Sequence, residues 1–436
     1  MNRKNVIIGL SILFLGIFVQ GQFVYGQPVG KQMKAGIAID SISNGSVYCL
    51  TLTDDAYLFD SARYSIFIPH GISKIQGVFV HQHGCTMEGR GVSTAYDIQY
   101  QAFAKKWGLA LVGPDLYSAS GNCHNWRDPE SGSAAALIKA LEEVGMTSGH
   151  PELGMAPWLL WGHSGGGYWT LGMLRDYSER TLAVFAYSPG FDPSWDYPAS
   201  AHKVPFMIRH AGIDDAPFGF CYDTAIHTFD KLRKSGGYVS ISYTPYQTHN
   251  YSFVRYMAIP FYEAVLAQRL PEGQSSALRD MDESKAWLGD TLLLNTYKSS
   301  GYQGDKSAMC WLPDSATAAK WKEYVITGTV IDRTPPVPPY DLKMRVKHNY
   351  MVELSWHVDA DIESGIKHFN IYKGGKLITR FPESGDYQRF DTNGDDAIPV
   401  ILPDLKLEVT GIAMDGEKIS ISAVNHFLLE SPSVEF

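Results

Sequence analysis

The sequence has no block rich in lysine and arginine, and its 46 acidic residues outnumber its 37 basic residues, giving a net charge of -9. Binding to nucleic acid requires a basic face that neutralises phosphates, so this composition disfavours a nucleic-acid partner. The five cysteines contain no Cys-x-x-Cys pair, which disfavours a zinc or thiol redox site. With 436 residues, of which 45% are hydrophobic and 19% charged, the chain is globular and long enough for two domains.

Long hydrophobic runs are also scarce, and the one that stands out is residues 6–19 at the N-terminus. This run is too short to span a membrane comfortably. Arg3 and Lys4 precede it and a small, polar stretch follows, which is the pattern of a secretory signal peptide. A membrane anchor is the alternative interpretation. We therefore expect residues 1–27 to be a cleaved signal peptide, the mature protein to be secreted or periplasmic, and no membrane span to remain.

Between residues 47 and 270, short apolar runs alternate with helix-like segments. This alternation predicts a mostly parallel sheet with helices on both faces. The expected strands are residues 47–53, 64–69, 77–80, 109–112, 158–161, 181–188, 204–210 and 238–243, and the expected helices are residues 96–107, 133–144, 165–175, 222–234 and 253–269.

The composition changes after residue 270, and a proline-rich stretch at 332–339 can form neither a helix nor a central strand. Beyond it, strand-like segments recur without helices, as in a β-sandwich of about 100 residues. We therefore expect an α/β catalytic domain at 28–275, an appendage packed on it at 276–331, and a β-sandwich at 332–436.

One Gly-x-Ser-x-Gly motif occurs in the chain, at Gly162-His163-Ser164-Gly165-Gly166. An apolar run of strand length precedes the motif and a helix-like segment follows it. A serine on such a sharp turn points its hydroxyl out of the backbone, and the small glycines let strand and helix approach closely. Ser164 is thus a candidate nucleophile, although a glycine-rich connection without chemistry is the alternative.

A serine nucleophile requires a general base, which in a parallel sheet must come from a loop at the carboxyl ends of the strands. His249 follows the last expected parallel strand and is the candidate base. His227 falls inside an expected helix and is a weaker candidate.

The orienting acid should follow the strand at 204–210, where Asp214 and Asp215 stand side by side. Asp215 is preferred because it lies one residue further beyond the turn, and Asp214 is the main alternative. Asp192 and Asp196, after the preceding strand, are less favoured placements. The three roles then occur along the chain in the order Ser, Asp, His.

The oxyanion of an acyl-transfer intermediate needs two backbone N–H donors. Gly165 follows the nucleophile at the start of a helix and offers one. Cys85, after His83-Gly84 in the loop behind the strand at 77–80, offers the other.

The strand followed by a His-Gly loop, the Gly-His-Ser-Gly-Gly turn, the Gly-x-x-Asp loop and the late histidine together resemble the α/β-hydrolase superfamily, over roughly residues 47–270. The chain is similar in form to secreted bacterial esterases of the feruloyl-esterase and polyhydroxyalkanoate-depolymerase type. The resemblance implies a Ser164/Asp215/His249 triad and an acyl-enzyme mechanism without a cofactor. One departure is that the His-Gly-Cys-Thr stretch lacks the run of glycines found in many lipases.

A second resemblance covers about residues 335–436. Thr334-Pro335-Pro336, Leu354-Ser355-Trp356 and the alternating stretch at 420–425 resemble a fibronectin type III module. A spacer or packing partner is the role expected for this module, because its sequence shows no exposed aromatic row of the kind that binds glycans.

Two further hypotheses concern the loops at the same end of the sheet. Cys85 and Cys123 follow neighbouring strands, so a disulfide between these loops is plausible in an exported protein. His81-x-His83 could be a metal pair, but no third ligand is linked to it by spacing. Aromatic residues on these loops either pack the loops together or line a pocket for a sugar or aryl group; they are Tyr117, Trp126, Trp195 and Phe218.

These observations favour an exported serine hydrolase of carboxylic esters, with acyl or aryl esters on polysaccharides as candidate substrates. A serine peptidase of the same fold and a non-catalytic extracellular binding protein are the two alternatives. The sequence leaves the natural ester and the oligomeric state open.

Overall fold

A computed structural model describes residues 32–34, 36–85, 89–190, 192, 194–212, 215–249, 253–271, 277–348, 350–388, 402, 404–410 and 416–436. The expected signal peptide at residues 1–27 lies outside this part of the chain. Within the part described, no helix combines the length and apolarity needed to cross a membrane.

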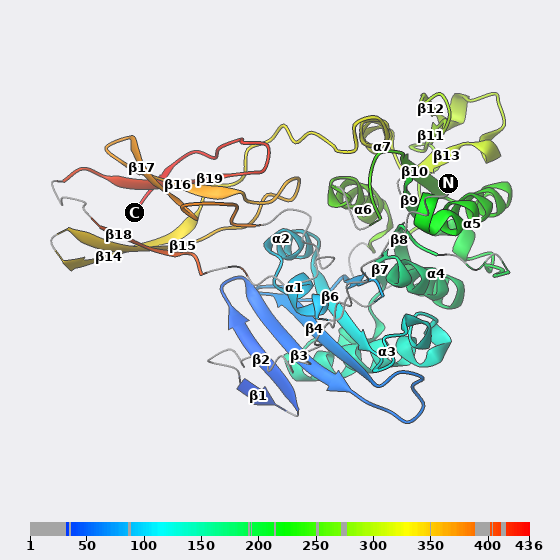
Figure 1. The fold of residues 1–436 in the computed structure, drawn as a ribbon, viewed down its shortest axis with the longest axis horizontal. Helices are drawn as coiled ribbons and strands as arrows, with labels where there is room; N and C mark the ends of the chain where they lie inside the picture. Colours follow the sequence, from blue (N-terminus) through cyan, green and yellow to red (C-terminus); the bar gives the residue numbers. More distant parts are fainter. Residues whose placement is uncertain are drawn as a thin grey trace, which may run out of the picture.

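A ten-stranded sheet in the order β1-β2-β3-β4-β6-β5-β7-β8-β9-β10 forms the centre of the larger body (Figure 1). From β6 to β10 all neighbouring strands are parallel, whereas β1 to β4 pair antiparallel with one another and β4 pairs antiparallel with β6. The strands are β1 (Gln32–Lys34), β2 (Ile37–Ile42), β3 (Gly45–Leu52), β4 (Ser61–Pro69), β5 (Gly77–Gln82), β6 (Leu109–Tyr117), β7 (Trp158–His163), β8 (Thr181–Tyr187), β9 (Phe206–Ala211) and β10 (Val239–Thr244).

Helices cover both faces of this sheet, as the alternating pattern predicts. Helices α1, α2 and α6 lie on one side, and α3, α4 and α5 lie on the other (Figure 1). Every residue of β5, β7 and β8 is buried, which explains why these strands read as continuous apolar runs. The helices are α1 (Arg90–Ala95), α2 (Ile98–Trp107), α3 (Ser133–Ser148), α4 (Gly165–Tyr177), α5 (Asp215–Lys234) and α6 (Arg255–Arg269).

Several element boundaries differ from the sequence-based expectation, and strands β1 and β2 were not expected. Helix α5 begins at Asp215, seven residues before the expected start at 222. Its first turn contains a proline and is followed by a glycine, which weakens the helical signal, but proline is tolerated in a first turn because the N–H groups there have no intrahelical partner. The short helix α1 was not expected, because six residues are too few to show a helical period.

The appendage that the sequence left unassigned contains a small sheet and one helix. The sheet has the order β12-β11-β13, with β11 (Trp287–Gly289), β12 (Thr296–Lys298) and β13 (Cys310–Leu312), and the helix is α7 (Ser315–Thr327). Trp321 of α7 is buried and donates its indole N–H to the carbonyl of Ile241 on β10, at 2.9 Å. The appendage therefore packs directly on the edge strand of the large sheet.

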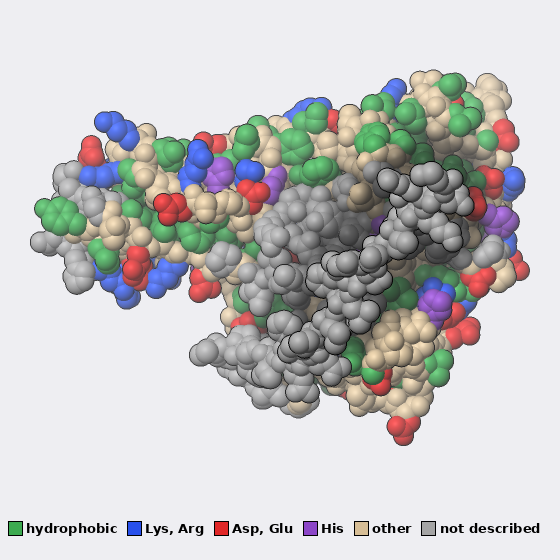
Figure 2. Space-filling view, in the orientation of Figure 1, with side chains coloured by type: hydrophobic (Ala, Val, Ile, Leu, Met, Phe, Trp, Pro, Cys, Tyr) green, Lys and Arg blue, Asp and Glu red, His purple; other side chains and the backbone are tan. Residues whose placement is uncertain are grey.

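The C-terminal part is two antiparallel sheets packed on a shared core that includes Trp356, Phe369 and Ile421. One sheet has the order β14-β15-β18 and the other β17-β16-β19-β20. The strands are β14 (Tyr340–His348), β15 (Met351–His357), β16 (His368–Lys373), β17 (Lys376–Phe381), β18 (Lys406–Thr410), β19 (Ile419–Val424) and β20 (Val434–Glu435). Acidic and basic side chains are both scattered over this part on the face shown in Figure 2.

The C-terminal sheets lie beside helix α2 (Figure 1), and a buried polar network joins them to it. Arg255, fully buried on α6, donates to Asp97 Oδ2 at 3.0 Å and to Gln99 Oε1 at 2.8 Å. Gln388 of the C-terminal part donates to the same Gln99 oxygen at 3.3 Å, and Gln99 Nε2 donates to the carbonyl of Ile362 at 2.9 Å. The two bodies therefore share buried, specific contacts.

Candidate active site

Ser164 sits at the turn between strand β7 and helix α4, with φ 51° and ψ -115°. A positive φ is unusual for a residue other than glycine and indicates backbone strain that the surroundings must hold. The Ser164 N–H donates to the carbonyl of Tyr187 on β8 at 3.0 Å, and the Ser164 carbonyl accepts the first helical bond from Tyr168 at 3.0 Å. The strand, strained turn and helix expected around the serine are therefore present.

The glycines of the motif allow this turn to pack tightly. A Cβ at Gly162 would overlap the carbonyl oxygen of Gly166, and a Cβ at Gly166 would overlap the carbonyl oxygen of His83. The first turn of α4 thus lies against both its own strand and the end of β5. Any larger side chain at either position would push the serine turn away from the sheet.

The loop after β10 brings His249 against this turn. The carbonyl oxygen of His249 accepts a hydrogen bond from His163 Nε2 at 3.1 Å, and the two imidazole rings are 5.1 Å apart between centroids. Burial, with His249 close by, holds the pKa of His163 well below its usual value of 6.5. His163 is therefore neutral near pH 7, and the carbonyl acceptor places its single ring proton on Nε2.

The loop after β9 approaches the His249 loop closely. A Cβ at Gly212 would overlap the backbone of Pro245, so the two loops touch just beyond the ends of their parallel strands. Asp214 lies outside the described residues, and Asp215 begins helix α5, with its side chain outside the description. Gly212, directly after the end of β9, therefore lies against the loop that holds His249.

The two less favoured acids have local partners. The Asp192 carboxylate accepts from the backbone N–H and hydroxyl of Ser194 at 2.9 and 2.6 Å. The Asp196 carboxylate is largely exposed and pairs with Lys231 Nζ at 2.6 Å. Neither of these contacts involves His249.

The loop after β5 places the Cys85 backbone nitrogen beside the serine turn, 3.5 Å from the position of a Cβ on Gly165. His83 Nε2 accepts from the N–H of Leu116 at 3.2 Å, which puts the ring proton of a neutral His83 on Nδ1. Nδ1 then donates to the carbonyl of Gly84 at 2.6 Å. That carbonyl belongs to the same planar peptide as the Cys85 N–H, so His83 sets the direction in which this N–H points.

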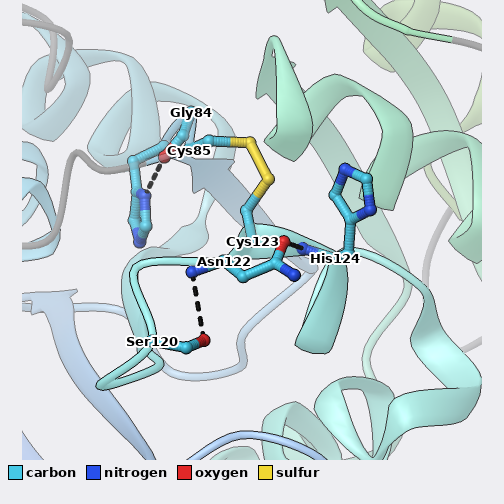
Figure 3. Close-up of a disulfide and its surroundings, with 7 residues drawn as sticks. Gly84, Cys85, Ser120, Asn122, Cys123 and His124 are labelled. Carbon is cyan, nitrogen blue, oxygen red and sulfur yellow. Dashed lines mark hydrogen bonds between the residues drawn. A yellow bond between two sulfur atoms is a disulfide. The ribbon is translucent and has the colours of Figure 1, made fainter.

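A disulfide joins Cys85 to Cys123 and so ties the loop after β5 to the loop after β6 (Figure 3). This is the pairing hypothesised from the sequence. On the Cys123 side, Asn122 caps the short turn by accepting from the N–H of His124 at 3.0 Å. The disulfide packs against Gly165 and gives the Cys85 backbone a second anchor besides His83.

The aromatic loop residues differ in their surroundings. Trp126 is fully buried and packs edge-to-face on His83 at 5.3 Å, so it belongs to the core under the loop after β5 and not to an open pocket wall. Trp195 packs on Tyr168 at 4.6 Å and under the guanidinium of Arg175 at 4.4 Å. Tyr117, at the end of β6, is 47% exposed. The side chain of Phe218 lies outside the description.

His81 and His83 have separate partners, since His81 Nδ1 lies 3.3 Å from the hydroxyl of Thr94. In the described ranges, no three His, Cys, Asp or Glu side chains group as ligands for a metal ion.

Replacing Gly165 with alanine should lower kcat by about 10²- to 10³-fold, the typical effect of losing one oxyanion donor. The added Cβ would overlap Cys85 Sγ and lie 3.3 Å from Cys123 Sγ, so the disulfide and the Cys85 N–H must move. Gly219→Ala is the matched control, because Gly219 is also in a helix and has no atom within 4 Å of its Cβ position. Steady-state kinetics on an ester substrate checks the prediction.

The clash can be separated from other effects of the alanine. In a Cys85→Ala/Cys123→Ala background the sulfur atoms are gone, and Gly165→Ala should cost much less there. Equal kcat values for the Gly165 and Gly219 variants would contradict the prediction.

Sequence reasoning missed three residues whose side chains form hydrogen bonds within or to the His249 loop. They are His163, Arg209 and Gln247. Arg209 carried a usable signal, because an arginine inside the apolar strand 204–210 is rarely fully buried without a specific partner. His163 and Gln247 carried none, since their partners are set by the fold.

The mostly parallel sheet, with a serine on a strand–turn–helix and loops that follow in the order Ser, Asp, His, fits the α/β-hydrolase fold. No family model matches the chain, and no curated protein matches it. Among solved structures, an S-formylglutathione hydrolase from Agrobacterium tumefaciens is similar at 16% identity, covering 53% of this chain and 99% of that chain, with a TM-score of 0.37. A thermostable esterase is similar at 19% identity, covering 50% of this chain and 60% of that chain, with a TM-score of 0.37. A ferulic acid esterase is similar at 16% identity, covering 51% of this chain and 99% of that chain, with a TM-score of 0.37.

Proposed function

We propose that the protein is a serine hydrolase that cleaves carboxylic esters through an acyl-enzyme. Ser164 Oγ attacks the ester carbonyl while His249 takes its proton, and His249 then returns the proton to the leaving alcohol. Water, activated by His249, releases the acid. The N–H groups of Gly165 and Cys85 stabilise the oxyanion of each tetrahedral intermediate, and Asp215 orients the imidazole.

The observation that carries this proposal is the seating of the His249 loop on the Ser164 turn, where His163 Nε2 donates to the His249 carbonyl at 3.1 Å. The Cys85 nitrogen lies beside Gly165, the residue that follows Ser164. The proximity of the Ser164 turn, the His249 loop and the Cys85 backbone supports the roles that we propose for these residues.

We further propose that residues 1–27 direct export and that the C-terminal β-sandwich is a fibronectin type III-like packing partner. Acyl or aryl esters of polysaccharides are the proposed substrates, with Tyr117 as the exposed aromatic residue available to such a group. The alternative hydrolase is a peptidase that uses the same residues.

Incubation with a fluorophosphonate probe should label the protein on Ser164, as mapped by mass spectrometry of the peptide that carries it. The labelled protein should lose its activity on p-nitrophenyl acetate, because the probe reacts with activated serine nucleophiles. Comparison of p-nitrophenyl acetate with aminoacyl-nitroanilides tests the bond type, and the ester should be the better substrate. A protein that stays unlabelled and inactive on both substrates would be a binding protein, and preference for the anilides would make it a peptidase.

A further inference from the structure

Two buried donors hold the peptide groups on both sides of His249. Arg209 Nη1 donates to the carbonyl of Thr248 at 3.0 Å, and His163 Nε2 donates to the carbonyl of His249 at 3.1 Å. The first carbonyl belongs to the peptide before His249 and the second to the peptide after it. With one hydrogen bond on each peptide group, the backbone dihedrals of His249 are restrained, and so is the direction of its Cα–Cβ bond.

Arg209, on β9, is fully buried and reaches three loop acceptors with its planar fork. Besides the Thr248 carbonyl, Nη1 donates to the hydroxyl of Ser188 at 3.1 Å, and Nη2 donates to Gln247 Oε1 at 3.1 Å. The guanidinium therefore connects the end of β8 with the loop after β10. Its position in turn depends on the Gln247 side chain.

Gln247 links this arginine to the appendage. The residue is 8% exposed, and its Nε2 donates to the carbonyl of Gly328 at 2.7 Å. Gly328 is the C-cap of helix α7, with φ 79°. The neighbouring Tyr246 hydroxyl also donates to the carbonyl of Ile326 at the end of α7. A continuous chain of contacts thus runs from the end of α7 through Gln247 and Arg209 to the backbone of His249.

We propose that the end of helix α7, through its hydrogen bond to Gln247, holds the loop of the catalytic base in position. Gln247 is then a positioning residue for His249. This inference rests on the proposed role of His249 as the general base. The appendage at 276–331 then takes part in catalysis at a distance, because it holds the loop that must present the imidazole to Ser164. A misplacement of about 1 Å in such a group lowers turnover by about 10²-fold without changing which groups are present.

Gln247→Leu removes both links and should lower kcat on p-nitrophenyl acetate by about 10- to 100-fold, with KM changed by less than about threefold. The matched control is Gln268→Leu. Gln268 is also buried and also joins the α/β body to the appendage, donating to the carbonyl of Pro313 at 3.2 Å and accepting from the N–H of Asp282 at 3.1 Å. Both variants should lower the melting temperature to a similar degree, but only Gln247→Leu should lower kcat.

A second pair of variants reaches the same link from the appendage side. A Cβ at Gly328 would overlap the side-chain amide of Gln247 and displace it. Gly149 is the control, since it caps helix α3 in the same left-handed conformation, with φ 86°, and has no atom within 4 Å of its Cβ position. Gly328→Ala and Gly149→Ala carry the same backbone strain, and only the first should lower kcat. This pair also decides the question if Gln247→Leu does not fold.

The outcomes separate the inference from the function on which it rests. Suppose that the wild type hydrolyses the ester and is labelled on Ser164, but the Gln247 and Gly328 variants keep the kcat of their controls. The positioning role of Gln247 is then wrong, and the proposed function stands. If the wild type is neither active nor labelled, the proposed function fails and the inference fails with it. A loss of kcat confined to the Gln247 and Gly328 variants supports the positioning role of Gln247.

Discussion

Replacing Ser164 with alanine is expected to lower kcat for ester hydrolysis by about 10⁶-fold, as the loss of a serine nucleophile does elsewhere. Without Oγ there is no acyl-enzyme, and only substrate binding and oxyanion stabilisation remain. These residual effects sustain roughly 10³- to 10⁴-fold acceleration over water. The fold should persist, because alanine adopts the strained turn at φ 51° no worse than serine does, and the Ser164 N–H bond to Tyr187 involves only the backbone.

Steady-state kinetics with p-nitrophenyl acetate measures this loss, and the melting temperature shows that the variant is folded. Ser240→Ala is a suitable control, since Ser240 is a buried serine on β10 that lies four residues before the carboxyl end of the strand. It should keep wild-type kcat. Activity of the Ser164 variant within tenfold of wild type would mean that the nucleophile is another residue.

The large sheet and the serine turn could be predicted because their signals are local. The buried runs of β5, β7 and β8 stand out as apolar segments, and a glycine-flanked serine between a strand and a helix has few other uses. The proximity of the loops that carry Ser164 and His249 could also be predicted, because the carboxyl ends of parallel strands lie at the same edge of a sheet. The contact between His163 and His249 is the outcome of that arrangement.

The remainder depends on contacts between distant segments. The strands of the appendage are three residues long, too short for a period, and they become strands only by pairing with one another. The bond from Gln247 to Gly328 joins residues 81 positions apart, and nothing near either residue indicates it. Trp126 reads as a loop aromatic, yet it is buried because the disulfide and His83 bring the two loops together over it.

The sequence does not decide whether Asp214 or Asp215 is the acid of the proposed triad, but substitution can distinguish them. We expect Asp215→Asn to lower kcat by about 10⁴-fold, because asparagine at the acid position of a triad stabilises the wrong imidazole tautomer. Asp214→Asn should change kcat by less than about tenfold, since a carboxylate outside the triad acts only through space.

The backbone explains why the choice is between these two residues. Gly212 lies against Pro245 in the loop that precedes His249, and helix α5 begins three residues later, at Asp215. A carboxylate in the first turn of a helix interacts favourably with the helix dipole, which is compatible with an ionised acid at residue 215.

Each asparagine variant serves as the control for the other, because both remove one negative charge from the same loop. A large loss with Asp214→Asn and a small one with Asp215→Asn would reverse the assignment. Small losses in both would place the acid elsewhere, with Asp192 next in line, because it follows the adjacent strand β8. In the double variant, the loss should equal that of the true acid alone, because only one carboxylate can orient the imidazole of His249.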